Sequence, residues 1–244
     1  RDWNFEGADE AARRAKKWLW SMQNDDGGWG AFDINNNREI LTHVPFADHN
    51  ALIDPSTSDI TSRILEFYGN DGVPISDQRV VRALEFIRHD QEDDGSWYGR
   101  WGVNYIYGTW QVLKGLQAIG EDMNRPYVRR GAEWLVSVQN DDGGWGESCD
   151  SYEDPALKGI GESTPAQTAW TLLGLIAAGC ANHDSVKRGV NHLLDTQRDD
   201  GGWDEQWYTG TGFPKVFYLE YTMYRHYFPT MALAAYRDSA SEVF

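Results

Sequence analysis

Two pairs of side chains in this sequence have the types and the spacing to act together on a proton or a cation. Asp59 and Arg63 are four residues apart, and Tyr221 and Tyr224 are three apart, so each pair would share one face of a helix. A cation lowers the pKa of a neighbouring carboxylate, and a desolvated ring face attracts a cation by about 0.5–2 kcal/mol. The pairs therefore indicate proton handling and cation stabilisation. An exposed ion pair and plain core packing are the structural alternatives.

Aromatic residues are far more frequent than in an ordinary chain. The sequence has 12 Trp and 12 Tyr among 244 residues, and such rings need either a packed core or a lined cavity. Cys149 and Cys180 have neither a metal-type spacing nor a disulfide framework, so we expect two reduced thiols. A cytoplasmic setting fits this expectation.

The charge of the chain excludes some classes of partner. A net charge of −16 argues against binding to nucleic acid and offers no basic strip for an anionic membrane. No apolar run approaches the roughly 18 residues that span a bilayer, and the chain begins in a polar stretch without a signal-peptide core. By itself the chain is expected to be soluble.

A block that begins with Gln and ends with Trp occurs four times. Each block contains Asp-Asp-Gly-Gly, or Asp-Asp-Gly-Ser in the second copy, which ends a helix because these residues tolerate left-handed backbone. We expect the Gln amide to bind backbone groups at helix ends and the Trp ring to clamp neighbouring hairpins, both as structural residues. The blocks run from Gln23 to Trp29, Gln91 to Trp97, Gln139 to Trp145 and Gln197 to Trp203.

The spacing of the blocks predicts an array of helical hairpins. Successive blocks are 68, 48 and 58 residues apart, and no hairpin can bury its apolar face without a neighbour. Outer amphipathic helices end at the blocks, and Thr164 and Pro165 are a typical helix start. We therefore predict an all-α toroid and a single domain over residues 1–244. The buried inner helices are expected at 59–68, 108–119, 165–178 and 221–236.

Two long connections, 31–57 and 204–218, interrupt the array. They have little helical periodicity but carry several aromatic residues beside Gly and Pro. Long ordered loops in a compact domain are often functional, although these could also merely cover the barrel ends.

The blocks are similar to the QW motifs of triterpene cyclases, and further stretches closely resemble squalene-hopene cyclase. These are GSWYGRWGVNY at 95–105, SYEDP at 151–155 and GTGFP at 210–214, while YTMYRHYFP at 221–229 looks like the family's last inner helix. The resemblance covers essentially the whole chain and favours the bacterial, hopene-forming branch. It implies an incomplete (α/α)6 barrel, squalene cyclised to hopene or hopanol, and no metal or redox cofactor.

The resemblance also implies roles for individual residues. Asp59, Arg63 and Tyr107 would support the catalytic acid and its reprotonation, and Phe46 and Leu219 would belong to the substrate channel. Phe32 stands where the family commonly carries Tyr, so a ring face without a hydroxyl is expected there. The rings that stabilise carbocations would be Phe32, Trp101, Phe213, Phe217, Tyr221 and Tyr224.

The family's acid, an Asp in an Asp-x-Asp-Asp motif, does not occur in this chain. We therefore expect an N-terminal segment of the same cyclase as a partner. For the complete enzyme we expect a peripheral, monotopic membrane location and a homodimer. Four hairpins are too few for a closed ring, so the isolated chain should self-associate. The alternatives are a non-catalytic isoprenoid-binding module, a zinc-containing prenyltransferase β-subunit and a class II diterpene cyclase.

Overall fold

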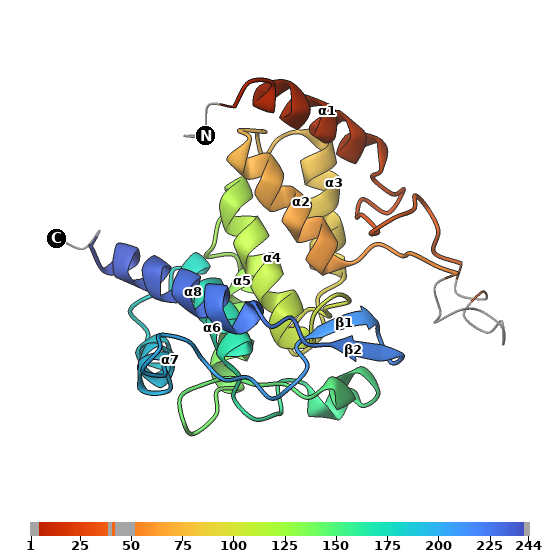
Figure 1. Ribbon diagram of the computed structural model, residues 1–244. Coiled ribbons are helices and arrows are strands. Elements are labelled where there is room, and N and C mark those ends of the chain that lie inside the picture. Colours follow the sequence, from red (N-terminus) through yellow and green to blue (C-terminus); the bar gives the residue numbers. More distant parts are fainter. Residues whose placement is uncertain (1–4, 39–40, 42–51, 242–244) are drawn as a thin grey trace.

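The structure is a computed structural model that describes residues 5–38, 41 and 52–241. Its described part is mostly helical, and one short antiparallel hairpin lies near the C-terminal helix (Figure 1). The α-helices are α1 (Ala8–Ser21), α2 (Ser58–Asn70), α3 (Gln78–His89), α4 (Tyr105–Ile119), α5 (Pro126–Ser137), α6 (Pro165–Ala177), α7 (Asp184–Asp195) and α8 (Tyr224–Ser241). The shorter elements are the 3-10 turns η3 (Cys149–Tyr152) and η4 (Pro155–Leu157) and the strands β1 (Gly210–Phe213) and β2 (Phe217–Leu219).

The helices form an inner and an outer row, as the repeat predicts. The inner helices α2, α4, α6 and α8 contact one another in chain order, and α3, α5 and α7 pack outside them (Figure 1). Most side chains of α4 and α6 are buried, whereas α3 and α7 bury only one face. Added methyl groups at Gly69 and Gly115 would lie within 2.4 Å of backbone atoms across the α2–α4 contact. Glycine at these positions therefore lets the two inner helices approach closely.

Each Gln-to-Trp block joins the end of an outer helix to the following inner helix. The indole Nε1 of every block Trp donates to a backbone carbonyl ten residues earlier, at 2.7–2.8 Å. In the first three blocks the Trp backbone amide also donates to a Thr Oγ1 of the inner helix, namely that of Thr61, Thr109 or Thr168. One buried Trp thus ties both helices of its hairpin, as a structural clamp would.

The block glutamines link each hairpin to the next one. Gln139 Nε2 donates to the carbonyl of Gly143 at 2.7 Å and to that of Ser185, in the first turn of α7, at 2.9 Å. Gln23 and Gln91 make the equivalent pairs of bonds to α3 and α5. The predicted pairing of Gln with backbone groups at helix ends is confirmed, and the second bond fixes the hairpin spacing.

The inner helices α2, α4 and α6 begin and end within three residues of their predicted bounds, whereas α8 begins three residues later and ends five residues later than predicted. Thr164 accepts a hydrogen bond from the Gln167 amide at 3.0 Å, which confirms it as the cap of α6. The last helix begins at Tyr224, so the prediction that Tyr221 lies on the same helix is wrong. Tyr221 instead begins a turn, in which its own carbonyl accepts a hydrogen bond from the Tyr224 amide at 2.7 Å.

The connection at 204–218 contains the hairpin β1–β2, which no sequence pattern predicts. Gly210 pairs with Leu219 and Thr211 with Tyr218, and a register irregularity follows before Phe213 pairs with Phe217. Strands of three or four residues are too short to show alternation. The hairpin also bridges to the 99–104 loop, because the Val103 amide donates to the Thr209 carbonyl at 3.0 Å.

Candidate functional site

Four of the predicted rings form a chain of edge-to-face contacts across three separate segments. The centroid of Phe32, after the first block, lies 5.7 Å from that of Trp101 at an interplanar angle of 89°. Trp101 lies 6.0 Å from Phe213 on β1, which lies 5.9 Å from Phe217 on β2. Edge-to-face packing holds each ring in a defined orientation. The structure thus brings together rings that are far apart in the sequence.

A second group of rings joins α4, α6 and α8. Trp110 and Trp170 stack with centroids 5.5 Å apart and planes at 4°, and Tyr107 lies 5.1 Å from Trp170. Tyr224 lies 5.9 Å from Trp170, and Tyr221 stacks on Tyr224 at 4.6 Å. The two tyrosines therefore act as a pair even though only Tyr224 is helical. Trp110 and Trp170 are absent from the predicted site, and the surplus of Trp is the sequence signal that points to them.

Asp59 is buried at the first turn of α2, with backbone amides around its carboxylate. Its Oδ2 accepts from the amides of Arg100 and Trp101, each at 3.0 Å, and its Oδ1 accepts from the Ile60 amide at 2.9 Å and from Thr57 Oγ1 at 2.5 Å. Burial raises the pKa of Asp59, and the hydrogen bonds oppose that shift. The carboxylate thus anchors the loop that carries Trp101.

Asp59 and Arg63 were predicted to share one helix face and to act together. In the described part of the chain they do not form an ion pair. Arg63 Nη2 instead lies 3.4 Å from the hydroxyl of Tyr107, a weak hydrogen bond between α2 and α4. Burial raises the pKa of Tyr107, so this hydroxyl keeps its proton at neutral pH. An exposed Asp–Arg pair, the structural alternative, is wrong because Asp59 is only 1% exposed.

Two buried glutamates lie at the starts of inner helices and were not expected from the sequence. Glu147 Oε2 accepts from the amides of Asn104 at 3.3 Å and Ile106 at 2.9 Å, at the start of α4. Glu205 Oε1 accepts from the Ala166 amide at 3.4 Å, at the start of α6. Burial raises the pKa of both, that of Glu205 to about 7. Both follow a block Trp by two residues, which is the signal that could have identified them.

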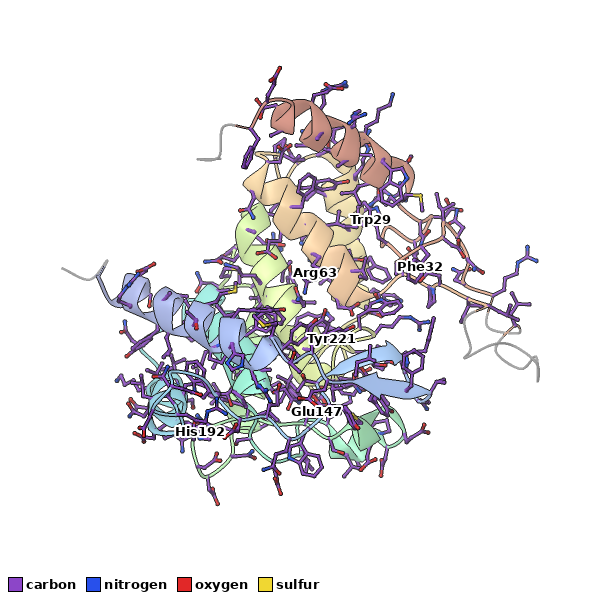
Figure 2. All side chains as sticks on the ribbon, in the orientation of Figure 1. Trp29, Phe32, Arg63, Glu147, His192 and Tyr221 are labelled. Atoms are coloured by element: carbon purple, nitrogen blue, oxygen red, sulfur yellow. The ribbon has the colours of Figure 1, made fainter. Side chains whose placement is uncertain are left out.

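Several of the predicted rings are exposed in this chain. Phe32 is 66% exposed, and Phe217 and Tyr221 are each more than a third exposed. Figure 2 shows Phe32 beside the start of α2 and Tyr221 before α8. Leu219, predicted for the substrate channel, is half-buried on β2 opposite Gly210. Phe46 lies outside the described residues.

The described ranges contain neither a metal-type cluster nor a membrane-spanning helix. In residues 5–38, 41 and 52–241, no group of three His, Cys, Asp or Glu side chains could hold a metal ion. No helix in these ranges is long and apolar enough to cross a bilayer. Cys149 and Cys180 are free, and burial raises the pKa of Cys149 to about 12.

Known proteins resemble this chain over almost its whole length. Residues 3–238 match the family described as squalene-hopene cyclase C-terminal domain. The chain is 47% identical to the squalene–hopene cyclase of Zymomonas mobilis, with 94% of this chain and 35% of that protein covered. It is 50% identical to the squalene–hopene cyclase of Alicyclobacillus acidocaldarius, with 94% and 36% covered. The chain therefore spans about a third of the length of these relatives.

Solved structures of terpene cyclases share the arrangement of helices. The type II terpene cyclase MstE from Scytonema superposes with a TM-score of 0.63 at 16% identity, covering 98% of this chain and 70% of that one. The ent-copalyl diphosphate synthase from Streptomyces platensis gives 0.57 at 19% identity, covering 90% and 36%. These likenesses confirm the predicted α/α toroid fold. The family match over residues 3–238 and the 47–50% identity to squalene–hopene cyclases lead to one conclusion: the chain belongs to the squalene-hopene cyclase family and corresponds to its C-terminal domain.

Proposed function

We propose that this chain forms one aromatic wall of the cyclisation cavity in a squalene-hopene cyclase. The observation that carries the proposal is the continuous contact of Phe32, Trp101, Phe213 and Phe217, which converge from three segments. The substrate would be squalene or a related polyprene, and the products hopene and hopanol. Such a wall stabilises carbocations because ring faces attract positive charge and offer no basic lone pair.

The rings would act at different stages of one cascade. Phe32 would face an earlier cation, and Phe213 and Phe217 the later ones. Tyr221 and Tyr224 present a second stacked surface, joined through Tyr224 to the rings of α4 and α6. Each desolvated ring would lower the energy of a nearby cation by about 0.5–2 kcal/mol.

Proton supply would combine this chain with a preceding part of the same cyclase. The Asp of an Asp-x-Asp-Asp motif would protonate a terminal alkene of the substrate. The charge of Arg63 would favour the ionised form of that neighbouring carboxylate, and the Tyr107 hydroxyl would help to reprotonate it. Asp59 would hold the 99–104 loop and thereby place Trp101.

The exposed rings support a location next to further protein. Phe32 is 66% exposed and Tyr221 39% exposed, and exposed apolar rings of this kind can form a contact with further protein. In the complete cyclase the preceding segment would cover this face and exclude water from the cations. A peripheral attachment to the cytoplasmic side of a membrane belongs to the same proposal.

The experiment joins this chain to the part of the Alicyclobacillus relative that precedes the matched region, and analyses products from squalene by gas chromatography with mass detection. Hopene from the joined protein, and none from the chain alone, is the expected result. Phe213→Leu should raise the share of incompletely cyclised products. The matched control is Phe67→Leu, which removes a partly buried ring of α2 outside the wall.

An unchanged product ratio in Phe213→Leu would overturn the assignment of the wall. Squalene bound without any product from the joined wild type would favour the non-catalytic isoprenoid-binding module instead.

A further inference from the structure

The 99–102 turn contacts both the buried carboxylate of Asp59 and the ring wall of the proposed site. Its amides at Arg100 and Trp101 hold Asp59 Oδ2, each at 3.0 Å. The Trp101 ring meets both Phe32 and Phe213. A shift of this turn would therefore disturb the buried carboxylate and the ring wall together.

A single hydroxyl group from another segment bonds to both ends of this turn. Tyr152 Oη, at the end of η3, donates to the carbonyl of Gly99 at 2.6 Å and to that of Gly102 at 2.8 Å. The one hydroxyl proton is shared between the two carbonyls, which flank the two amides that bind Asp59. Tyr152 is 4% exposed, so water does not readily replace this contact.

Ring contacts hold Tyr152 in place, and a second ring packs closely on the turn. The Tyr152 ring lies 5.6 Å from Tyr98 and stacks on Tyr218 of β2 at 5.9 Å. An added methyl group would lie 2.4 Å from the Tyr107 ring at Gly102 and 2.9 Å from it at Gly99. The turn is thus in contact with both the Tyr107 ring and the Tyr152 hydroxyl, with little room to shift.

We propose that Tyr152 is a positioning residue for cyclisation, which holds the 99–102 turn so that its amides stay on Asp59 and Trp101 stays in the ring wall. This inference rests on the proposed function of the wall. Tyr152 does not touch the substrate in this scheme. Its ring contact with Tyr218 also connects the turn to the hairpin that carries Phe213 and Phe217.

Removing only the Tyr152 hydroxyl tests its hydrogen bonds to the turn separately from the packing of its ring. Tyr152→Phe keeps the ring contacts but leaves both carbonyls without their shared donor, in a place that water does not readily reach. We expect kcat for squalene to fall about tenfold with little change in KM, because the loss acts on the oriented wall and not on apolar binding. The share of incompletely cyclised products should rise, because Trp101 and Phe213 lose their fixed spacing.

The matched control is Tyr98→Phe. Tyr98 belongs to the same ring cluster, and in the described part of the chain its hydroxyl makes no hydrogen bond. Both variants are made in the protein joined to the N-terminal part of the relative. Product ratio is the decisive readout, since a loss of folded protein lowers the yield without changing the ratio of products.

Hydrogen exchange of the Arg100 and Trp101 amides is measured in the same proteins. Faster exchange in Tyr152→Phe, together with the changed product ratio, is expected, while Tyr98→Phe matches the wild type. A wild-type product ratio and exchange rate in Tyr152→Phe would overturn the inference. If the joined wild type makes no product, the proposed function fails, and exchange still decides whether Tyr152 holds the turn.

Discussion

Glu205 should make the stability of this fold fall as the pH rises towards neutral. Its side chain is buried at the start of α6, with one long hydrogen bond to Oε1 and none to Oε2 within the described residues. Burial raises its pKa from the ordinary 4.5 to about 7. The folded state therefore binds this proton more tightly than the unfolded state does.

The sign and size of the effect follow from that difference in pKa. Below pH 4.5 the group is protonated in both states and costs no stability. Between pH 4.5 and about 7 the unfolded state ionises first, so the free energy of unfolding falls. A rise in pKa from 4.5 to about 7, at about 1.4 kcal/mol per pH unit, gives a total loss of about 3.5 kcal/mol. Above pH 7 this contribution should be constant.

The perturbation is Glu205→Gln, which is neutral at every pH and retains an acceptor for the Ala166 amide. Urea unfolding followed by circular dichroism between pH 4.5 and 8 gives the difference in unfolding free energy from the wild type. We expect the variant to equal the wild type near pH 4.5 and to be more stable by about 3.5 kcal/mol at pH 8. Other buried carboxyls cancel in this difference.

Glu121 provides a control, because its side chain is as little exposed as that of Glu205 while its pKa is shifted in the opposite direction. It is 7% exposed, as is Glu205, but hydrogen bonds from Arg88 and Tyr127 outweigh burial and lower its pKa. Glu121→Gln should therefore destabilise the protein at neutral pH, and the difference should shrink as the pH falls through the lowered pKa. A pH-independent difference for Glu205→Gln would refute the reasoning that its burial is uncompensated.

Two further outcomes are expected from the repeat. Trp145→Phe should lower the unfolding free energy, measured by chemical unfolding, by about 2–4 kcal/mol. The smaller ring leaves a void and removes the donor to the Leu135 carbonyl. The control Trp18→Phe, at an exposed position of α1, should change the unfolding free energy by less than about 0.5 kcal/mol. The isolated chain should self-associate through its exposed rings; sedimentation velocity should show mass rising with concentration, and a monomeric mass at every concentration would contradict this.

Local signals predicted the parts of the fold that depend on local chemistry. The block at Gln139 to Trp145 follows α5 as predicted, but α5 already ends at Ser137, and its cap residue Val138 is not left-handed. The left-handed residue of the block, Gly143 with a φ of 88°, forms the tight turn inside the block instead of the helix cap. Thr164 caps α6 because its hydroxyl accepts the Gln167 amide. Tyr221 shows the limit of helical periodicity as a signal. Its spacing to Tyr224 continues the helical pattern, but in the structure a hydrogen bond from the Tyr224 amide to the Tyr221 carbonyl closes a turn before the helix begins.

The parts of the site that sequence reasoning missed depend on contacts between distant segments. Trp110 and Trp170 are ordinary apolar helix positions until α4 and α6 are placed side by side. Glu147 resembles an exposed loop residue until the start of α4 approaches it. The rings Phe32, Trp101, Phe213 and Phe217 were identified through the family resemblance, not through their spacing.

The bond from each block Trp to a carbonyl ten residues earlier also determines where this fold can change length. Because the indole reaches back over a fixed stretch, an insertion or deletion between Leu135 and Trp145 would break the clamp of that hairpin. The block separations of 68, 48 and 58 residues show that the other segments do vary. New loops or reporter peptides should therefore be tolerated after the inner helices, for example following Gly120 or Gly179, where the surrounding space is open, provided that both glycines are kept because their φ values of 83° and 75° are left-handed.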